Sequence, residues 1–217
     1  MNKRAVLIDL WKTLIVDTGA YKQFIQESFP RKTYEEIHHF VLENDFGSAR
    51  NCISNIIRTF YINPQKSKNE GIAIPDEDTV FRMYLKFHEL IPQVNPYAIT
   101  ALVKLKKRNI RFALVSNSNN FLEDAHIRTH IGSLFEKDLI ILSHKVGYRK
   151  PHPKIYQAAL ERLCLTPQEV IMIGDQLEKD VLPIEKLGGT GILYDPNGKS
   201  DYKGNKINDL REILGYL

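Results

Sequence analysis

Four polar clusters lie at the carboxyl ends of predicted strands, and their side chains are of the types that transfer phosphoryl groups. In sequence order the clusters are Asp9, Ser116-Asn117, Lys150, and Gly174-Asp175 followed by Asp180. A carboxylate can attack phosphorus and form an aspartyl-phosphate, which divides one difficult displacement into two easier ones. The types and order of these residues predict a phosphoryl-transfer site in which Asp9 is the nucleophile.

The charges of these side chains indicate a divalent metal ion. The three carboxylates of Asp9, Asp175 and Asp180 carry a charge of about −3, and Lys150 contributes about +1. One Mg²⁺, bound through hard oxygen ligands, neutralises the remaining charge of about −2. The Ser116 hydroxyl, with Lys150 and neighbouring backbone amides, would hold the phosphoryl oxygens. Singly, each cluster also fits a structural role, since a carboxylate can cap the next helix and a Ser-Asn pair can form a turn. Their occurrence in order at corresponding strand ends favours a shared site.

The elements that would carry these residues alternate between strands and helices. Continuous apolar runs predict strands buried on both faces, as in a parallel sheet covered by helices; the runs are 5–9, 112–116, 139–143, 170–175 and 190–195. From residue 98 onward, segments with helical spacing separate them; these are 98–108, 121–130, 154–163 and 178–187. The alternation predicts an α/β fold with a doubly wound parallel sheet, in which ligands bind outside the carboxyl ends of the strands.

The connection between the first two strands is far longer than a strand–helix–strand unit of about 30 residues requires. The additional residues of this connection include four segments with apolar residues at helical spacing, 21–29, 34–44, 48–61 and 76–91, and a polar loop at 63–71. We therefore predict a core domain of residues 1–15 and 98–217, interrupted by a helical cap subdomain of residues 16–97. The cap is inserted at the ligand-binding edge, and its candidate contacts to substrate are Tyr21, Phe24, Arg50, Arg58 and one of His38 and His39.

The composition is that of an ordinary globular chain. The 217 residues are 43% hydrophobic and 26% charged, and the formal net charge is +4. This charge is too small to indicate nucleic acid binding, but it suits an anionic substrate. No apolar stretch approaches the length of a membrane span, and Cys52 and Cys164 lack metal-binding spacing. We predict a cytoplasmic protein without nucleic acid or membrane partners, and no pattern in the sequence predicts an oligomeric state.

The motifs around these residues resemble those of the haloacid dehalogenase-like (HAD) hydrolase superfamily. DLWKTL (9–14) is similar to its first motif, VSN (115–117) to its second, KPHPKIY (150–156) to its third and GDQLEKD (174–180) to its fourth. The helical insertion matches the family's cap between the first and second motifs. The resemblance implies a Rossmann-like core, Mg²⁺ as cofactor and a small phosphorylated metabolite as substrate.

The resemblance also implies a role for each site residue. The catalytic residues would be Asp9, Ser116 and Lys150, and Thr13 would support the loop after the nucleophile. The substrate phosphate would be bound by Ser116, Asn117 and Lys150. The metal ligands would be Asp9, the backbone carbonyl of Trp11, Asp175, and Asp180 directly or through water.

Two residues after the nucleophile depart from the family pattern. Trp11 stands where the family's phosphatases carry an aspartate as general acid and base, and Lys12 stands where they carry glycine. Because an indole cannot perform that proton transfer, we predict an atypical or weak phosphatase that favours leaving groups needing no proton, such as acyl or activated aryl phosphates. Two alternatives stay open. One is a metal-independent 2-haloacid dehalogenase, since those enzymes carry an aromatic residue at this position, and the other is a non-catalytic protein that binds a ligand at a phosphate site.

Overall fold

The core of the protein is a parallel sheet with helices on both faces. The computed structural model describes residues 3–62, 73–90, 92–122 and 128–217. Six strands pair in the order β3-β2-β1-β4-β5-β6, and all five pairings are parallel. Their bounds are β1 Ala5–Ile8, β2 Arg111–Ser116, β3 Ile140–Leu142, β4 Val170–Gly174, β5 Thr190–Tyr194 and β6 Lys206–Ile207. The predicted α/β fold with a doubly wound parallel sheet is confirmed.

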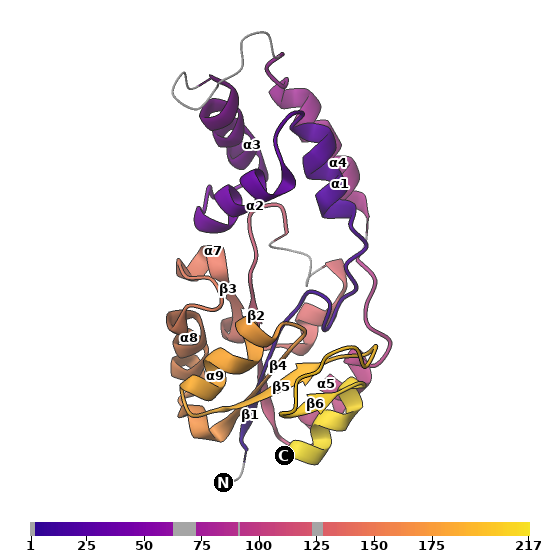
Figure 1. The fold of residues 1–217 in the computed structure, drawn as a ribbon, viewed down its shortest axis with the longest axis vertical. Helices are drawn as coiled ribbons and strands as arrows, with labels where there is room; N and C mark the ends of the chain where they lie inside the picture. Colours follow the sequence, from indigo (N-terminus) through magenta and orange to yellow (C-terminus); the bar gives the residue numbers. More distant parts are fainter. Residues whose placement is uncertain (1–2, 63–72, 91, 123–127) are drawn as a thin grey trace.

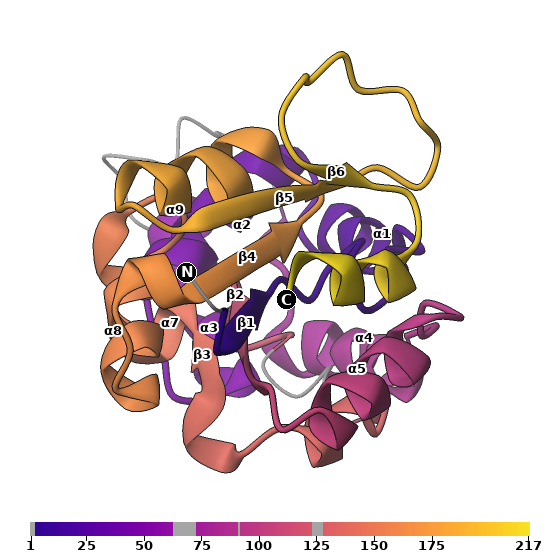
Figure 2. The same ribbon diagram turned by 90° about the horizontal axis from the view of Figure 1, so that it is seen from below.

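Alternate residues of the strands face the two helical layers. In β1, Val6 and Ile8 pack with α5 (Ala98–Lys107) and the C-terminal 3₁₀ helix (Leu210–Tyr216). Ala5 and Leu7 point to the opposite face, which packs against α8 (Pro153–Leu163) and α9 (Leu182–Lys186). Figure 2 shows the sheet between these layers. Every residue of β1 is buried, because both faces are covered, and this explains why the strand reads as a continuous apolar run.

The inserted helices have a hydrophobic cluster of their own and lie at the end of the molecule opposite the two chain termini (Figure 1). They are α1 Ala20–Ser28, α2 Tyr34–Glu43, α3 Ala49–Ile57 with a π-helical turn Arg58–Ile62, and α4 Glu77–Glu89. Side chains of Thr33, Ser48 and Asp76 accept hydrogen bonds from the first turns of α2, α3 and α4, which satisfies donors that a helix start leaves free. The predicted loop at 63–71 lies outside the described residues.

The two chain segments that join cap and core run side by side. Ile15 and Val94 form an antiparallel bridge, and the Val16 amide donates to the carbonyl of Gln93 at 2.7 Å. Asn95 extends this contact, because its side-chain amide donates to the Thr13 carbonyl at 2.9 Å and to the Tyr194 hydroxyl at 2.7 Å. The exact domain limits at 15/16 and 97/98 stay a prediction.

The predicted helix at 178–187 differs from the structure. Residues 177–187 are a π-helical turn, Leu177–Val181, followed by the short helix α9, instead of one regular helix. Pro183, in the first turn of α9, lacks the amide that a continuous helix would use there. The predicted helix 121–130 falls largely on residues outside the described ranges. Strand β6 was not predicted, since two residues carry no periodicity.

Among the described helices, none combines the length and apolarity that a membrane span requires.

α7 (Ser143–Val146) replaces the end of the predicted third strand. The strand β3 stops at Leu142, and the chain turns into one helical turn that ends at Gly147 with φ 76°. Ser143 closes this turn onto the loop after β2, since its hydroxyl accepts from the Ser118 amide and donates to the Ser118 carbonyl, both at 3.0 Å. The loops after β2 and β3 are thereby held together beside the carboxyl edge of the sheet.

Candidate active site

Asp9 lies at the carboxyl end of β1, beside the end of β4. Its amide donates to the carbonyl of Ile173 at 2.9 Å, which continues the pairing of β1 with β4 by one residue. The Asp9 side chain is buried, with 6% of its surface exposed. The parallel pairing therefore fixes this carboxylate next to the residues that follow β4.

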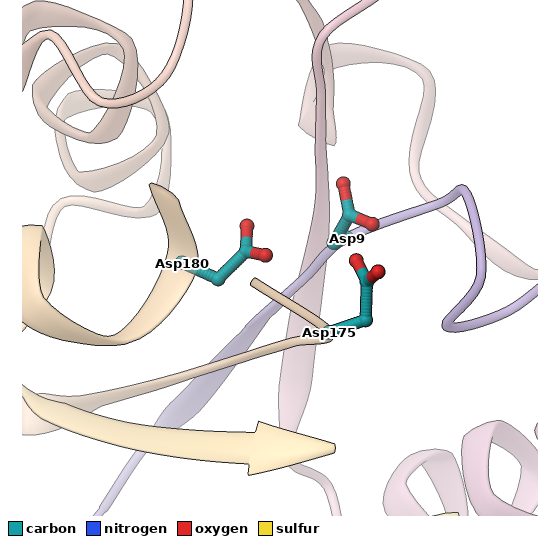
Figure 3. A group of neighbouring side chains, drawn as sticks. All are labelled: Asp9, Asp175 and Asp180. Carbon is teal, nitrogen blue, oxygen red and sulfur yellow. The ribbon is translucent and has the colours of Figure 1, made fainter. Parts of the chain in front are cut away.

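Three carboxylates meet at this edge of the sheet. Oxygens of Asp9, Asp175 and Asp180 lie within 4.8 Å of one another, and Figure 3 shows them approaching from the end of β1, the end of β4 and the following helical turn. The Asp180 side chain accepts from the Gln176 amide at 3.0 Å and packs over Gly174. A Cβ atom on Gly174 would clash with the Asp180 carboxyl, so glycine is required for this close approach.

Lys150 lies between two of the carboxylates. Its ammonium donates to Asp9 Oδ1 at 2.5 Å and to Asp180 Oδ1 at 2.6 Å, and the side chain is 3% exposed. Asn117 fixes the backbone of this lysine, because its side chain accepts from the Lys150 amide at 2.7 Å and donates to the Lys150 carbonyl at 3.0 Å. The loop after β2 thus positions the cation that precedes α8.

Burial controls the charge balance of the site. It raises the pKa of Asp9 to about 7, with Lys150 opposing the rise and Asp180 adding to it. Burial also raises the pKa of Asp175, and the charge of Asp180 acts in the same direction. Burial lowers the pKa of Lys150, but the charges of Asp180 and Asp9 outweigh burial, so this pKa lies above its usual value. Lys12 and Lys150 both lower the pKa of Asp175, but burial and Asp180 outweigh them, so the carboxylates are only partly compensated.

The donor set fits a hard divalent cation. Carboxylate oxygens are the ligands that Mg²⁺ prefers, and three of them converge here. Asp175 Oδ1 is buried and has no hydrogen-bond partner among the described residues. A buried carboxylate oxygen without a partner is costly unless a cation binds it. Asp9, Asp175 and Asp180 are the residues that would hold such an ion.

The other predicted site residues occupy three different environments. Ser116 is fully buried, and its hydroxyl donates to the Asn117 carbonyl at 3.4 Å. Thr13 is also buried and donates to Asp9 Oδ2 at 3.5 Å, which agrees with a supporting role for this hydroxyl. Asn117 lines the cavity described next, and it also clamps the Lys150 backbone. That the backbone carbonyl of Trp11 is a ligand, and that Ser116 binds phosphate, stay predictions.

A cavity of about 340 Å³ lies between the core and the cap, and Asp9, Lys150 and Asp180 form its floor. The described residues that line it further come from both parts: Trp11, Lys12, Asp17, Gly19, Tyr21, Lys22, Tyr34, His38, Leu42, Asn117, Leu122, Gln176 and Lys179. Tyr21 and His38 are thus cavity residues, as predicted for the cap. Phe24 is buried in the cap cluster, and Arg50 pairs with Asp78 at 2.8 Å instead of reaching the cavity.

Sequence reasoning missed Asp17 and Tyr34 as cavity residues. Asp17 lies in the linker to the cap, where its side chain accepts from the Gly19 amide at 2.9 Å and pairs with Lys12 at 3.8 Å. Tyr34 begins α2, directly after the Thr33 cap. An aromatic residue at a helix start has no signature of ligand contact, so only the packing of α2 over the core reveals this position.

Trp11 connects the two hydrophobic clusters. Its indole packs against both the core cluster and the cap cluster. The indole nitrogen is buried, and no described residue accepts a hydrogen bond from it. The side chain therefore lies at the junction of core and cap, beside the nucleophile, as a packing residue.

Lys12 adopts a backbone conformation that favours glycine. Its φ is +61°, which costs a residue with a Cβ about 1–2 kcal/mol. The side chain is exposed, and its 3.8 Å pair with Asp17 contributes little to stability. The sequence therefore retains a strained lysine directly beside the cavity.

Replacing Lys12 with glycine should stabilise the fold. We expect Lys12→Gly to raise the free energy of unfolding by about 0.5–1 kcal/mol, since relief of the backbone strain exceeds the added entropy of the unfolded chain. Lys12→Ala is the matched control, because it removes the charge and keeps the Cβ atom. Urea unfolding of the three proteins measures the difference, and equal stabilities of the glycine and alanine variants would contradict the strain.

Comparison with known proteins gives the family of the chain. The family model of the haloacid dehalogenase-like hydrolases matches residues 3–188. A glyceraldehyde 3-phosphate phosphatase of Methanocaldococcus jannaschii is 23% identical over an alignment of 224 positions. The alignment covers 97% of this chain and 95% of that protein. A phosphoserine phosphatase of Thermus thermophilus is 27% identical over 55% of this chain and 49% of its own length.

Solved structures with the same fold include both phosphatases and dehalogenases. A HAD phosphatase from Thermococcus onnurineus superimposes with a TM-score of 0.68 and 21% identity, over 100% of this chain and 97% of its own. A 2-haloacid dehalogenase from Pseudomonas syringae has the same TM-score, with 19% identity over 99% and 97% of the two chains. Since the family model covers most of the chain, this protein belongs to the haloacid dehalogenase-like hydrolases.

Proposed function

We propose that this hydrolase is a Mg²⁺-dependent phosphatase that acts on a small phosphorylated metabolite through an aspartyl-phosphate on Asp9. The observation that carries the proposal is the convergence of Asp9, Asp175, Asp180 and Lys150 on one buried point at the floor of the cavity. The related phosphatases support the reaction class. Their names include ribulose-1,5-bisphosphate 5-phosphatase as well as glyceraldehyde 3-phosphate and phosphoserine phosphatases.

In the first step an oxygen of Asp9 attacks phosphorus, the bond from phosphorus to the leaving oxygen breaks, and an acyl phosphate forms on the carboxyl. Lys150 lies 2.5 Å from Asp9 Oδ1, so its ammonium can also stabilise negative charge on the phosphoryl oxygens. The ion held by the three carboxylates would neutralise the phosphoryl charge and let one anion approach another. Ser116 and Asn117 are proposed to complete the phosphate contacts from the end of β2.

In the second step water attacks the phosphorus of the aspartyl-phosphate, which releases inorganic phosphate and restores the Asp9 carboxylate. A general acid and base at position 11 would assist both steps, typically by 10²–10⁴-fold. Trp11 offers neither, because an indole nitrogen donates a hydrogen bond but does not transfer its proton near neutral pH. We therefore propose a weak or specialised phosphatase, in which residues 16–97 act as the cap that selects the substrate.

Turnover of acetyl phosphate tests the proposed reaction. This substrate is small and its leaving group needs no proton, so the unmodified protein should release phosphate in Mg²⁺ and lose this activity in EDTA. Chloride release from 2-chloropropionate in EDTA would instead establish a metal-independent dehalogenase. Saturable phosphate binding without turnover of any phosphate ester or acyl phosphate would identify a non-catalytic protein.

The effect of Mg²⁺ on stability tests the metal site without an activity assay. Mg²⁺ at about 100 times its Kd adds about 2.7 kcal/mol, which should raise Tm by roughly 5–10 °C for a chain of this length. Asp175→Asn should remove most of this shift. It should also raise Tm in EDTA, because the variant loses a half-buried carboxylate that repels Asp180.

Asp138→Asn is the control for this measurement, since Asp138 is exposed and far from the three carboxylates in the fold. Its Tm and Mg²⁺ shift should match those of the unmodified protein. An Asp175→Asn protein that keeps the full Mg²⁺ shift would move the metal to another site.

A further inference from the structure

We infer that the cavity selects aryl phosphates, in which the phosphate is esterified to a hydroxyl group carried directly by an aromatic ring. This inference rests on the proposed phosphatase function and names its substrate class. Two independent features carry it, the aromatic wall that faces the catalytic floor and the packed indole at position 11. The volume of about 340 Å³ is near the lower limit of ligand cavities, which suits a group of one or two rings.

The aromatic wall consists of Tyr21, Tyr34 and His38 of the cap, and the charged side chains of Asp17 and Lys22 also line the cavity. Tyr34 and His38 stack, with ring centroids 4.8 Å apart and planes at 16°. Tyr21 meets both rings edge-on, at 5.9 Å and 5.7 Å. Because aromatic pairs gain energy beyond the area they bury, an aromatic ring in the cavity would be favoured over a saturated ring of the same size.

The three rings of the wall are held in place and are themselves uncharged, and the Lys22 ammonium lies 5.7 Å from the centroid of the Tyr34 ring. The Asn119 side chain, from the loop after β2, donates to the Tyr21 hydroxyl at 3.1 Å and ties this wall to the core. Burial, together with the charges of His39 and Lys179, lowers the pKa of His38 to about 4, so the imidazole is neutral at pH 7. A neutral ring stack recognises an apolar planar group better than it recognises an anion.

Trp11 favours aryl phosphates for a second reason, because it cannot protonate the leaving oxygen. Without a general acid, the leaving oxygen departs as an anion, and its ease of departure follows the pKa of the alcohol. A phenol has a pKa of about 10, as in tyrosine, whereas an unactivated hydroxyl lies nearer the value of about 15.7 for water. Aryl phosphates therefore need the absent acid least, and they also match the wall.

Three phosphate esters separate the two features in the unmodified protein with Mg²⁺. Phenyl and benzyl phosphate share a ring but differ in leaving-group pKa, so kcat/KM should be at least about 10²-fold higher for phenyl phosphate. Benzyl and cyclohexylmethyl phosphate share an alkyl leaving group but differ in aromaticity. The KM of benzyl phosphate should be about 2- to 12-fold lower, from the usual gain of an aromatic pair.

A variant of the wall tests which residues recognise the ring. Tyr34→Leu should bring the KM values of benzyl and cyclohexylmethyl phosphate to within about twofold of each other, because the stacked pair is lost. Phe40→Leu is the matched control on the same helix. Phe40 packs against Phe46 and Phe60 away from the cavity, so the KM ratio should stay that of the unmodified protein.

The outcomes distinguish this inference from the proposed function. Acetyl phosphate turnover with equal rates on phenyl and benzyl phosphate, or equal KM values for the two ring types, would overturn the aryl preference and leave the phosphatase standing. Faster hydrolysis of O-phosphoserine than of phenyl phosphate would also overturn it and assign substrate recognition to Lys22 and Lys179. Rapid benzyl phosphate hydrolysis that Asp17→Asn abolishes would identify Asp17 as the missing acid. Absence of turnover on acetyl phosphate and on all of these phosphate esters would reject the phosphatase itself.

Discussion

Asp9→Asn should lower the turnover of acetyl phosphate by about 10⁴–10⁶-fold, the range found when a catalytic nucleophile is removed. The amide has almost the shape of the carboxylate, and its oxygen can still accept from Lys150. It cannot form an acyl phosphate, so the first step loses its proposed nucleophile. Steady-state phosphate release measures the loss. Mass spectrometry of acid-quenched protein should find phosphate on the peptide containing Asp9 only before the substitution.

The Asp9→Asn variant should stay folded, which separates this loss from misfolding. Burial and Asp180 both disfavour a charged Asp9, so a neutral side chain there costs little stability. Its Tm in EDTA should equal or exceed that of the unmodified protein. A variant that keeps more than about a tenth of the turnover would show that Asp9 is not the nucleophile.

Lys150→Met should destabilise the metal-free protein by roughly 3–5 kcal/mol, because it leaves Asp9 and Asp180 buried without their shared cation. At this chain length the Tm in EDTA should fall by roughly 6–20 °C. Mg²⁺ should restore part of the loss, since the ion supplies positive charge to the same carboxylates. Urea unfolding with and without Mg²⁺ measures both effects.

Lys203→Met is the control for Lys150→Met, since Lys203 is exposed on the loop before β6. Its unfolding free energy should lie within about 0.5 kcal/mol of the unmodified protein. If Lys150→Met also lay within this range in EDTA, the ion pairs with Asp9 and Asp180 would not contribute to stability. The charge imbalance that supports the metal site would then be absent.

The sheet was predictable because its strands are buried on both faces, whereas short and irregular elements were not. The run at 5–9 is apolar at every residue before Asp9, and the structure places β1 at Ala5–Ile8. β6 has two residues, Lys206 and Ile207, and exists only because Tyr194 and Leu193 pair with it. The π-helical turn at Leu177–Val181 has the composition of an ordinary helix, so its geometry does not follow from local propensity.

The catalytic floor was predictable from sequence order, but the cavity above it was not. Asp9, Asp175 and Asp180 follow strands whose carboxyl ends share an edge, so their proximity follows from parallel pairing. Asn117 was predicted to bind substrate, and in the structure its side chain also forms two hydrogen bonds with the backbone of Lys150. The wall of Tyr21, Tyr34 and His38 depends on how the cap packs over the core. Tyr21 and His38 were among the predicted cap contacts, whereas Tyr34 was not, because its position over the core has no sequence signature.

The paired linkers have a consequence for the inserted helices. The chain leaves the core at Ile15 and returns at Val94, and these residues are bridged to each other. A segment whose two ends already meet can be lengthened, shortened or replaced at small cost in loop entropy to the fold that carries it. The inserted helices can therefore change in length or sequence at small cost to the sheet and its acidic edge.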